Sequence, residues 1–315
     1  MKKIITFLFL FLIFSNQLYA QTLIQALKET YKNNPQLNSA RENLEIAKQN
    51  INEAKSDFLP TITISGYISD ENTTKQTNTS GINVKENDID PSQQSILIEQ
   101  NLFQGLGNVA NVRKNNIGLE LSNFKLKKTE QEILFEAIEA YTALIVNKKK
   151  VEINISNVSL LERQVETDTN RLEQGEINLT DLAQSEASLA GAQSKLIQAK
   201  NELVTSKLNY EKTIGAIKQN GDLNEDYTFN YELPKSLALA NQISKKENPD
   251  LNIAILEFQQ SEQDVRIARS ELSPKASLSY KITETDNTSS SYDETDKSVL
   301  KAEASWPIFS GGKNT

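Results

Sequence analysis

The chain contains no histidine and no cysteine among its 315 residues. These absences exclude disulfides, thiolate nucleophiles and histidine general bases, and they remove the usual ligands of structural zinc. Only Asp, Glu, Lys, Tyr and Ser side chains remain for chemistry. We therefore predict no catalytic residue, no metal site and no cofactor, and we interpret the protein as something other than an enzyme.

Basic residues are in the minority. There are 34 Lys and Arg residues against 42 Asp and Glu residues, which gives a net charge of −8. A nucleic-acid partner is not expected, because proteins that bind nucleic acid present a basic face to the phosphates. Glycine (11) and proline (7) are also scarce, which favours long helices over a β-domain with many turns.

Long hydrophobic runs are missing after the N-terminal segment. Residues 1–20 hold two lysines followed by an eleven-residue apolar run, which is typical of a secretory signal peptide. Cleavage is expected before Gln21, although Leu18 stands where a small residue is usual. No later stretch reaches about 18 consecutive apolar residues, so no helical membrane anchor is predicted. The absence of cysteine also excludes a lipid on the new N-terminus.

One segment occurs twice. Residues 34–60 and 248–274 align at an offset of 214 without a gap, and nine of the 27 positions are identical. The prolines at both ends fall in register. We interpret this as an internal duplication; the alternative is a chance similarity between two polar helices of like composition.

Each copy changes its hydrophobic period at a proline. Helical spacing predicts helices over 36–58 and 249–272, and proline disfavours helix in the residue before it. Afterwards apolar and polar residues alternate, which predicts β-hairpins over 61–103 and 276–309. We expect polar loops at 70–93 and 285–297. The expected helix-to-sheet junctions are Pro60, Gly105, Pro274 and Gly311.

The predicted strands have one aliphatic face and about nine to eleven residues, which is the span of a tilted membrane strand. The alternative is a pair of soluble hairpins with one dry face. Four strands cannot close a barrel in lipid, because the open edges would leave backbone groups unpaired. Two protomers would give a barrel filled by side chains, whereas three would give twelve strands with room for a lumen.

A long helical hairpin is predicted over 107–216. Residues 107–173 contain no proline and carry apolar residues at helical spacing, over a length of about 100 Å. In LEQGEINLTDL, Gly175 can end this helix in a left-handed conformation. Asn178 or Thr180 can cap the next helix, and Asp181 adds charge near its N-terminus. Its leucine heptad, with small residues three positions later, predicts close antiparallel packing.

The duplication divides the chain into a first repeat at 21–220 and a second at 235–315. The second repeat has no counterpart of the long helical hairpin. By the spacing of the first repeat it would reach about residue 421. We therefore interpret the sequence as C-terminally truncated.

The order of these parts resembles the TolC family of outer-membrane efflux proteins over essentially the whole chain after the signal peptide. The resemblance is carried by NPQLNSARENLEIAKQNINEAKSDFLP, LFQGLGN, AYTALIVNKKKVEI and RLEQGEINLTDLAQSEASLAGAQ. It implies an α+β fold in which three protomers, with four strands each, form an outer-membrane β-barrel continuous with a periplasmic α-barrel of helical hairpins.

The resemblance also implies a function and partners. The family provides the exit duct of tripartite efflux or type I secretion systems, in which hairpin tips meet a periplasmic adaptor and an inner-membrane pump. Gly175, Thr180 and Asp181 match the tip motif, where the aspartate belongs to a network that constricts the periplasmic entrance. We expect a homotrimer in outer-membrane lipid that extends into the periplasm. The alternative is a soluble periplasmic coiled-coil adaptor or structural protein.

Overall fold

The computed structural model describes residues 21–72, 76–77, 80–81, 83–84, 89–217, 223–224, 232–289, 292–309 and 311. The predicted signal peptide lies outside these residues, as do parts of both predicted loops. The helices are α2 (Leu23–Asn33), α3 (Pro35–Ser56), α4 (Gly107–Glu173), α5 (Leu179–Thr213), α6 (Leu237–Glu247) and α7 (Pro249–Ser270). The strands are β1 (Thr61–Ile68), β2 (Gln76–Thr77), β3 (Asn83–Val84), β4 (Ser92–Gln104), β5 (Lys275–Ser289) and β6 (Tyr292–Ser305).

The chain forms two compact units. The first combines Met1–Glu42 with Leu126–Gln242, and the second combines Asn43–Lys125 with Ile243–Thr315. None of the described helices combines the length and apolarity needed to cross a bilayer.

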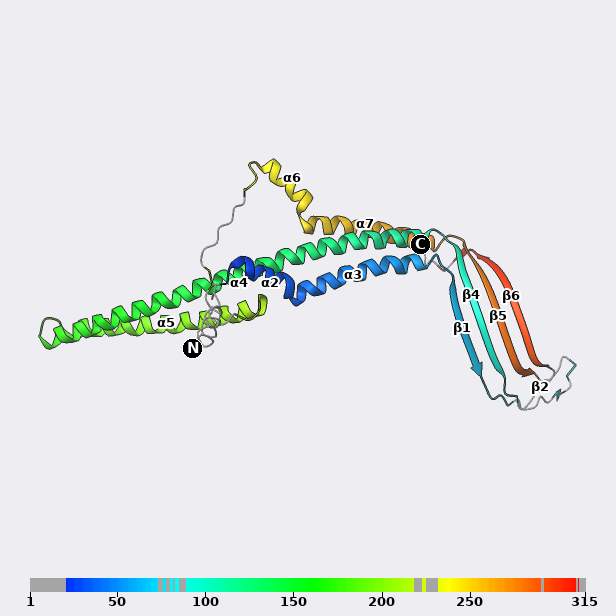
Figure 1. Cartoon of the computed structure of the whole chain (residues 1–315), viewed down its shortest axis with the longest axis horizontal. Helices are drawn as coiled ribbons and strands as arrows, with labels where there is room; N and C mark the ends of the chain where they lie inside the picture. The colour runs from blue at the N-terminus through cyan, green and yellow to red at the C-terminus, as the bar shows by residue number, and fades with distance from the viewer. Residues whose placement is uncertain are drawn as a thin grey trace, which may run out of the picture. The chain divides into compact units, whose positions relative to one another are not determined.

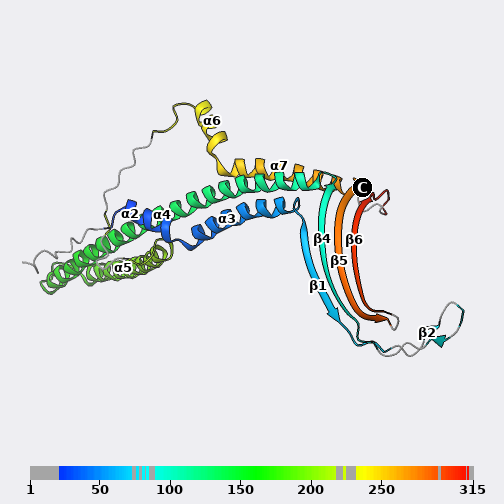
Figure 2. The same cartoon turned by 45° about the vertical axis from the view of Figure 1, so that its right-hand side comes forward.

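The second unit contains a four-stranded antiparallel sheet in the order β1-β4-β5-β6 (Figure 1, Figure 2). The alternation in the sequence sets its faces, because successive side chains of a strand point to opposite sides. Ile64 pairs with Ile96, and Ile96 pairs with Ile282. The aliphatic residues of neighbouring strands therefore form rows on one face.

The loop expected at 285–297 is wrong. β5 continues to Ser289 and β6 begins at Tyr292, with Thr285 paired to Thr295 and Asp286 paired to Glu294. Polar composition indicates a loop only where backbone groups bond to water. Here the ladder satisfies those groups, and threonine suits a strand.

The two hairpins have the same register. Thr61 pairs with Glu99 in the first hairpin, and Lys275 pairs with Ser305 in the second. Lys275 lies 214 positions after Thr61, which is the offset of the repeated segment before the hairpin. Ser305 lies 206 positions after Glu99, which is the distance between Gly105 and Gly311 after the hairpin. The duplication therefore extends to the pairing of individual backbone groups.

The helices before the two hairpins also end alike. After α3, the amides of Phe58 and Leu59 donate to the carbonyls three residues earlier. After α7, the amides of Leu272 and Ser273 do the same. Such three-residue bonds tighten the last turn and satisfy carbonyl groups at a helix end. Pro60 and Pro274 follow, and the strands begin one residue later.

The first unit is built on the antiparallel pair of α5 and the part of α4 from residue 126 (Figure 1, Figure 2). Ala192, Ala199 and Ser206 follow heptad leucines of α5 by three positions and are buried. Small side chains there let the two helices approach closely. The core cluster comprises Leu23 and Ala26 of α2, Ala137, Ala140, Tyr141 and Leu144 of α4, and Tyr210 and Ile214 at the end of α5.

Candidate functional site: the tip of the helical hairpin

Gly175 ends α4 in the left-handed conformation, with φ of 75°. The amide of Gly175 donates to the carbonyl of Leu172 over 2.9 Å, and that of Glu176 donates to the carbonyl of Arg171 over 2.9 Å. This pair of bonds is a Schellman motif, in which a residue with positive φ lets the chain turn back while the last carbonyls stay bonded. Gly175 therefore sets the turn at the tip.

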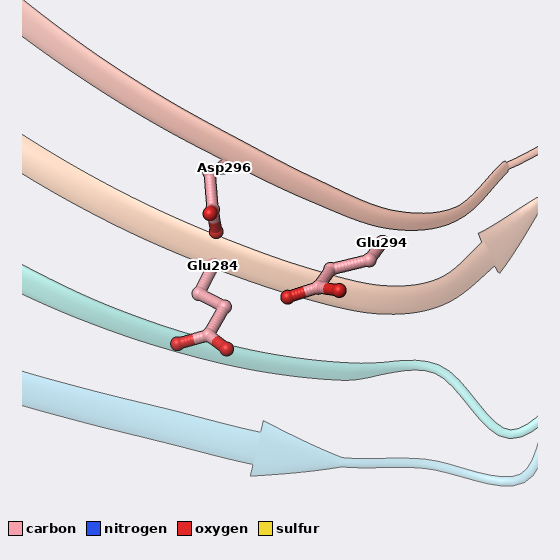
Figure 3. Close-up of side chains that lie close together, drawn as sticks. All are labelled: Glu284, Glu294 and Asp296. Carbon is pink, nitrogen blue, oxygen red and sulfur yellow. The ribbon is translucent and has the colours of Figure 1, made fainter.

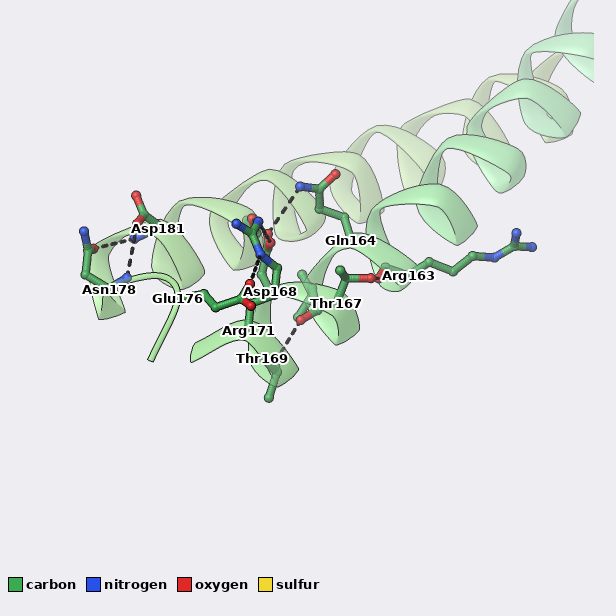
Figure 4. Close-up of polar contacts among 11 residues, drawn as sticks. Arg163, Gln164, Thr167, Asp168, Thr169, Arg171, Glu176, Asn178 and Asp181 are labelled. Atoms are coloured by element: carbon green, nitrogen blue, oxygen red, sulfur yellow. Dashed lines mark hydrogen bonds and ion pairs between the residues drawn. The ribbon is translucent and has the colours of Figure 1, made fainter. Parts of the chain in front are cut away.

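Asn178 caps α5, and Asp181 completes the cap (Figure 4). The amide of Asp181 donates to Oδ1 of Asn178 over 3.0 Å, and the amide of Asn178 donates to Oδ2 of Asp181 over 3.2 Å. The sequence left the choice between Asn178 and Thr180 open, and Thr180 instead lies exposed in the first turn. Asp181 is exposed too, with one carboxylate oxygen engaged in the capping box.

Asp168 of α4 ties the two helices together just behind the tip. Its Oδ2 accepts a 2.5 Å hydrogen bond from the hydroxyl of Ser185 on α5 and one of 3.3 Å from Nε2 of Gln164. The hydrogen bonds from Ser185 and Gln164 and the charge of Arg171 hold the pKa of Asp168 below its ordinary value, and burial opposes them. Asp168 therefore stays ionised although only 6% of its surface is exposed.

Arg171 connects Asp168 to the turn. Its Nη1 lies 3.7 Å from Oδ1 of Asp168, and its Nε lies 3.3 Å from Oε2 of Glu176 (Figure 4). This network was not predicted from the sequence. A signal was present, because Val151, Val158, Val165 and Leu172 recur every seven residues in α4 and Asp168 follows Val165 by three positions, where an apolar or small residue is usual.

A groove of about 690 Å³ lies further along the hairpin, lined mainly by amide and hydroxyl side chains of α4 and α5. Nζ of Lys150 bonds Oε2 of Glu202 across it over 2.9 Å. The hydrogen bond from Lys150, followed by that from Gln198, lowers the pKa of Glu202. These contacts join α4 and α5 to each other.

Pro60, Gly105 and Pro274 each lie between a helix and a strand of the second unit, and Gly311 follows β6. Gly105 has φ of 60° and Gly311 has φ of 64°. A Cβ atom added at Gly105 would lie 2.6 Å from the carbonyl oxygen of Ser270, so α7 and the start of α4 approach each other closely there. At Gly311 an added Cβ would meet no described atom within 4 Å.

Three carboxylates gather on the sheet, at Glu284 of β5 and at Glu294 and Asp296 of β6 (Figure 3). One oxygen from each lies within 4.8 Å of the others. Oxygen ligands of this kind suit Ca²⁺ or Mg²⁺, but all three side chains are exposed, and exposed acidic groups are common without an ion. The cluster therefore receives no metal assignment.

Residues 26–216, more than half of the chain, match the family described as outer membrane efflux protein. The chain belongs to the outer membrane efflux protein family. The resemblance to TolC-type proteins drawn from the sequence is confirmed. The outer membrane efflux protein BepC of Brucella suis is 30% identical over 202 residues, which cover 63% of this chain and 41% of BepC.

Two further relatives extend the comparison. The alkaline protease secretion protein AprF of Pseudomonas aeruginosa is 24% identical over 325 residues, which cover 99% of this chain and 66% of AprF. The CmeC outer membrane channel of Campylobacter jejuni superposes with a TM-score of 0.75 at 16% identity, over 93% of this chain and 62% of that one. At such low identity the likeness concerns the fold. This efflux-family chain thus spans between about two fifths and two thirds of the length of these relatives.

Proposed function

We propose that the chain is a subunit of an outer-membrane channel that forms the exit duct of a tripartite efflux or type I secretion system. It carries out no chemistry, and an inner-membrane pump supplies the energy. The observation that carries the proposal is the combination, in one efflux-family chain, of a sheet with an exposed apolar face and a long helical hairpin with an ordered tip.

The apolar face of the sheet supports contact with outer-membrane lipid. Ile64, Ile96 and Ile282 are cross-strand neighbours, yet their side chains are 78%, 39% and 43% exposed. Leaving apolar surface in water costs about 25 cal/mol per Å². A lipid environment removes this cost. A homotrimer would combine twelve strands, which is enough for a closed barrel around a lumen.

The tip is the proposed meeting point with the periplasmic adaptor. Gly175, Thr180 and Asp181 would line the entrance, with the free oxygen of Asp181 contributing charge to a constriction. The Asp168 network supports this role, because it joins both helices next to the turn and so fixes the position of the tip.

The remaining sequence predictions enter the proposal unchanged. Residues 1–20 would direct export and be removed, the repeats at 21–220 and 235–315 would each contribute two barrel strands, and Pro60, Gly105, Pro274 and Gly311 would mark the edge of the membrane. The protein would lie in the outer membrane and extend into the periplasm.

The test uses the gene in its own host. Deleting it should raise sensitivity to exported compounds or abolish secretion of a cargo protein, and restoring it should reverse this. The tagged protein should require detergent for extraction from outer membranes and should migrate as an oligomer. Recovery as a soluble periplasmic monomer would contradict the proposal and favour a coiled-coil adaptor.

A further inference from the structure

The two faces of the four-stranded sheet differ in charge as well as in polarity. Successive residues of a strand point to opposite faces. The even-numbered residues of β5 and β6 therefore lie on the face of the aliphatic rows, and the odd-numbered residues lie on the other face, which we call the polar face. Every charged residue of these two strands on the aliphatic face is acidic: Glu284, Asp286, Glu294 and Asp296. All four lysines of the two strands belong to the polar face: Lys275, Lys281, Lys297 and Lys301.

Three of these lysines form a cluster. Lys281 pairs with Val299, which places it diagonally next to Lys297 and Lys301, the residues two positions before and after Val299 on β6. Diagonal neighbours on a ladder lie about 7–8 Å apart, within reach of long side chains. Like charges repel each other at this separation. Stabilisation of the sheet therefore does not account for the lysine cluster, Lys281, Lys297 and Lys301.

Acidic side chains neutralise only part of the lysine cluster. Nζ of Lys301 bonds Oε2 of Glu303 on the same strand. Within the described part of the chain, Lys281 and Lys297 make no ion pair. The acids on the polar face of the four strands, which stand against the four lysines, are Glu99, Asp293 and Glu303. The aliphatic face of β5 and β6 carries acids alone, so positive charge is concentrated on the polar face.

We propose that the polar face lines the lumen of the channel and that the lysine cluster attracts the anionic groups of exported molecules as they pass through the barrel. This inference rests on the channel proposed above. It goes beyond that proposal because it names the residues that select among passing molecules and the charge that they select.

The depth of the lysine cluster supports this orientation. Lys281 lies between Tyr280 and Ile282, which both belong to the aliphatic face that would contact lipid. A lysine turned towards lipid at that depth is strongly destabilising, whereas a lysine turned towards a water-filled lumen is tolerated. The hydroxyl oxygens of Ser65 and Ser95 lie 2.9 Å apart on the same polar face. Hydroxyl groups and charges together suit a surface in contact with water.

The dimensions of the proposed barrel let the lysine cluster act across the lumen. Twelve strands spaced about 4.8 Å apart form a backbone ring of roughly 10 Å radius, and lysine side chains extend inward from it. Each lysine recurs once in every copy, so the cluster becomes rings of positive charge. The field of a charge extends about 8 Å at physiological ionic strength, and a passing molecule therefore crosses it. Rings of basic side chains favour anions, such as phosphate groups, in pores.

Charged thiol reagents measure the potential at the lysine cluster, because the chain has no cysteine of its own. The reporter is V299C, which lies opposite Lys281 and between Lys297 and Lys301. Intact cells of the native host are treated with an anionic methanethiosulfonate, which carries a sulfonate, or with a cationic one, which carries a trimethylammonium group. We expect K281Q/K297Q to lower the ratio of the anionic to the cationic reaction rate about fivefold. K281R/K297R keeps both charges and should keep the ratio.

Two further variants are matched controls for the face of the sheet. L300C places the thiol one residue away on the aliphatic face and should react with neither reagent, because lipid would cover it. E284Q removes a charge from that same face, so combined with V299C it should leave the ratio unchanged.

The outcomes separate the two proposals. An unchanged ratio in K281Q/K297Q, or an equal loss in K281R/K297R, would overturn the lysine cluster as a selective element and leave the channel intact. A shift in E284Q as large as that in K281Q/K297Q would also overturn it, because total charge and not the polar face would then set the potential. Equally fast reaction of L300C and V299C would place both faces in water and contradict the proposed function as well.

Discussion

Asp168 on α4 accepts a 2.5 Å hydrogen bond from Ser185 on α5, and this bond joins the two helices of the hairpin close to their connecting turn. The contact links helix packing to the geometry of the tip, since Arg171 continues from Asp168 to Glu176 in the turn.

Acid should loosen this end of the hairpin. The hydrogen bond from Ser185 leads the causes that hold the pKa of Asp168 below its ordinary 3.8. A carboxyl group whose folded pKa is depressed adds stability above the unfolded pKa and loses it as the pH falls through the folded pKa. We expect hydrogen exchange in tip peptides to rise below about pH 4. Asp168→Asn should flatten this dependence, whereas Glu166→Gln, a change at an exposed position of the same helix, should leave it intact.

Replacing Asp181 should open the proposed entrance. Asp181→Ala removes both a charge and the capping contact to Asn178, so it should increase conductance in planar bilayers. Asn178→Ala is the matched control, because it removes the cap and leaves the charge. Each change should destabilise the start of α5 by about 1 kcal/mol. Equal conductance changes in the two variants would mean that Asp181 acts only as a capping residue.

Gln21, just before α2, should be held in place by two buried tyrosines. The hydroxyl of Tyr210 donates to Oε1 of Gln21 over 2.8 Å, and the hydroxyl of Tyr141 lies 2.8 Å from the backbone oxygen of Gln21. Tyr210→Phe leaves the side-chain oxygen of Gln21 without this donor and should lower the free energy of unfolding by about 1–2 kcal/mol. Tyr31→Phe, which removes an exposed bond to Glu130, should cost less. Equal shifts in thermal unfolding would contradict a special role for the buried contact.

Alkali should weaken the same contact. Burial, then the charge of Glu29 and then Tyr141, raises the pKa of Tyr210 to about 12 from its ordinary 10.0. A raised folded pKa means that the stabilisation is complete below the unfolded pKa and is lost as the pH rises towards the folded one. Unfolding of the first unit should therefore become easier between pH 10 and 12, and the Tyr210→Phe variant should show a smaller change over this window. Thermal unfolding at a series of pH values measures both.

Gly105 should not tolerate a side chain. Gly105→Ala combines a positive φ with a Cβ atom 2.6 Å from the carbonyl oxygen of Ser270, so we expect a loss of about 1–3 kcal/mol. Gly191→Ala is the control, because Gly191 lies in α5 with open space around its Cβ position, and alanine there should stabilise the helix by up to about 1 kcal/mol. Destabilisation of equal size in both variants would show that the junction imposes no special constraint.

The sequence was most informative where one residue dictates a local conformation. Gly175 and the capping residues after it predicted the turn, and the fold class and family follow from the duplicated proline blocks. Prediction failed at 285–297, because the pairing of polar residues with each other depends on a neighbouring strand and not on composition. The contact between Asp168 and Ser185 was missed for a similar reason. It depends on how two helices face each other, and helical periodicity alone does not give the partner of a charged residue.

The matching registers of the two hairpins have an evolutionary consequence. Equivalent ladder positions, Ile68–Ser92 and Ile282–Ser298, are separated by segments that differ in length by eight residues. In the second hairpin this segment is itself paired almost to its turn, Ser289 with Tyr292, while the positions shared with the first hairpin keep their register. Insertions and deletions beyond the shared ladder positions therefore leave the pairing of those positions unchanged. The length of the segment can drift between descendants of one ancestral unit while the pairing of the strands is inherited unchanged.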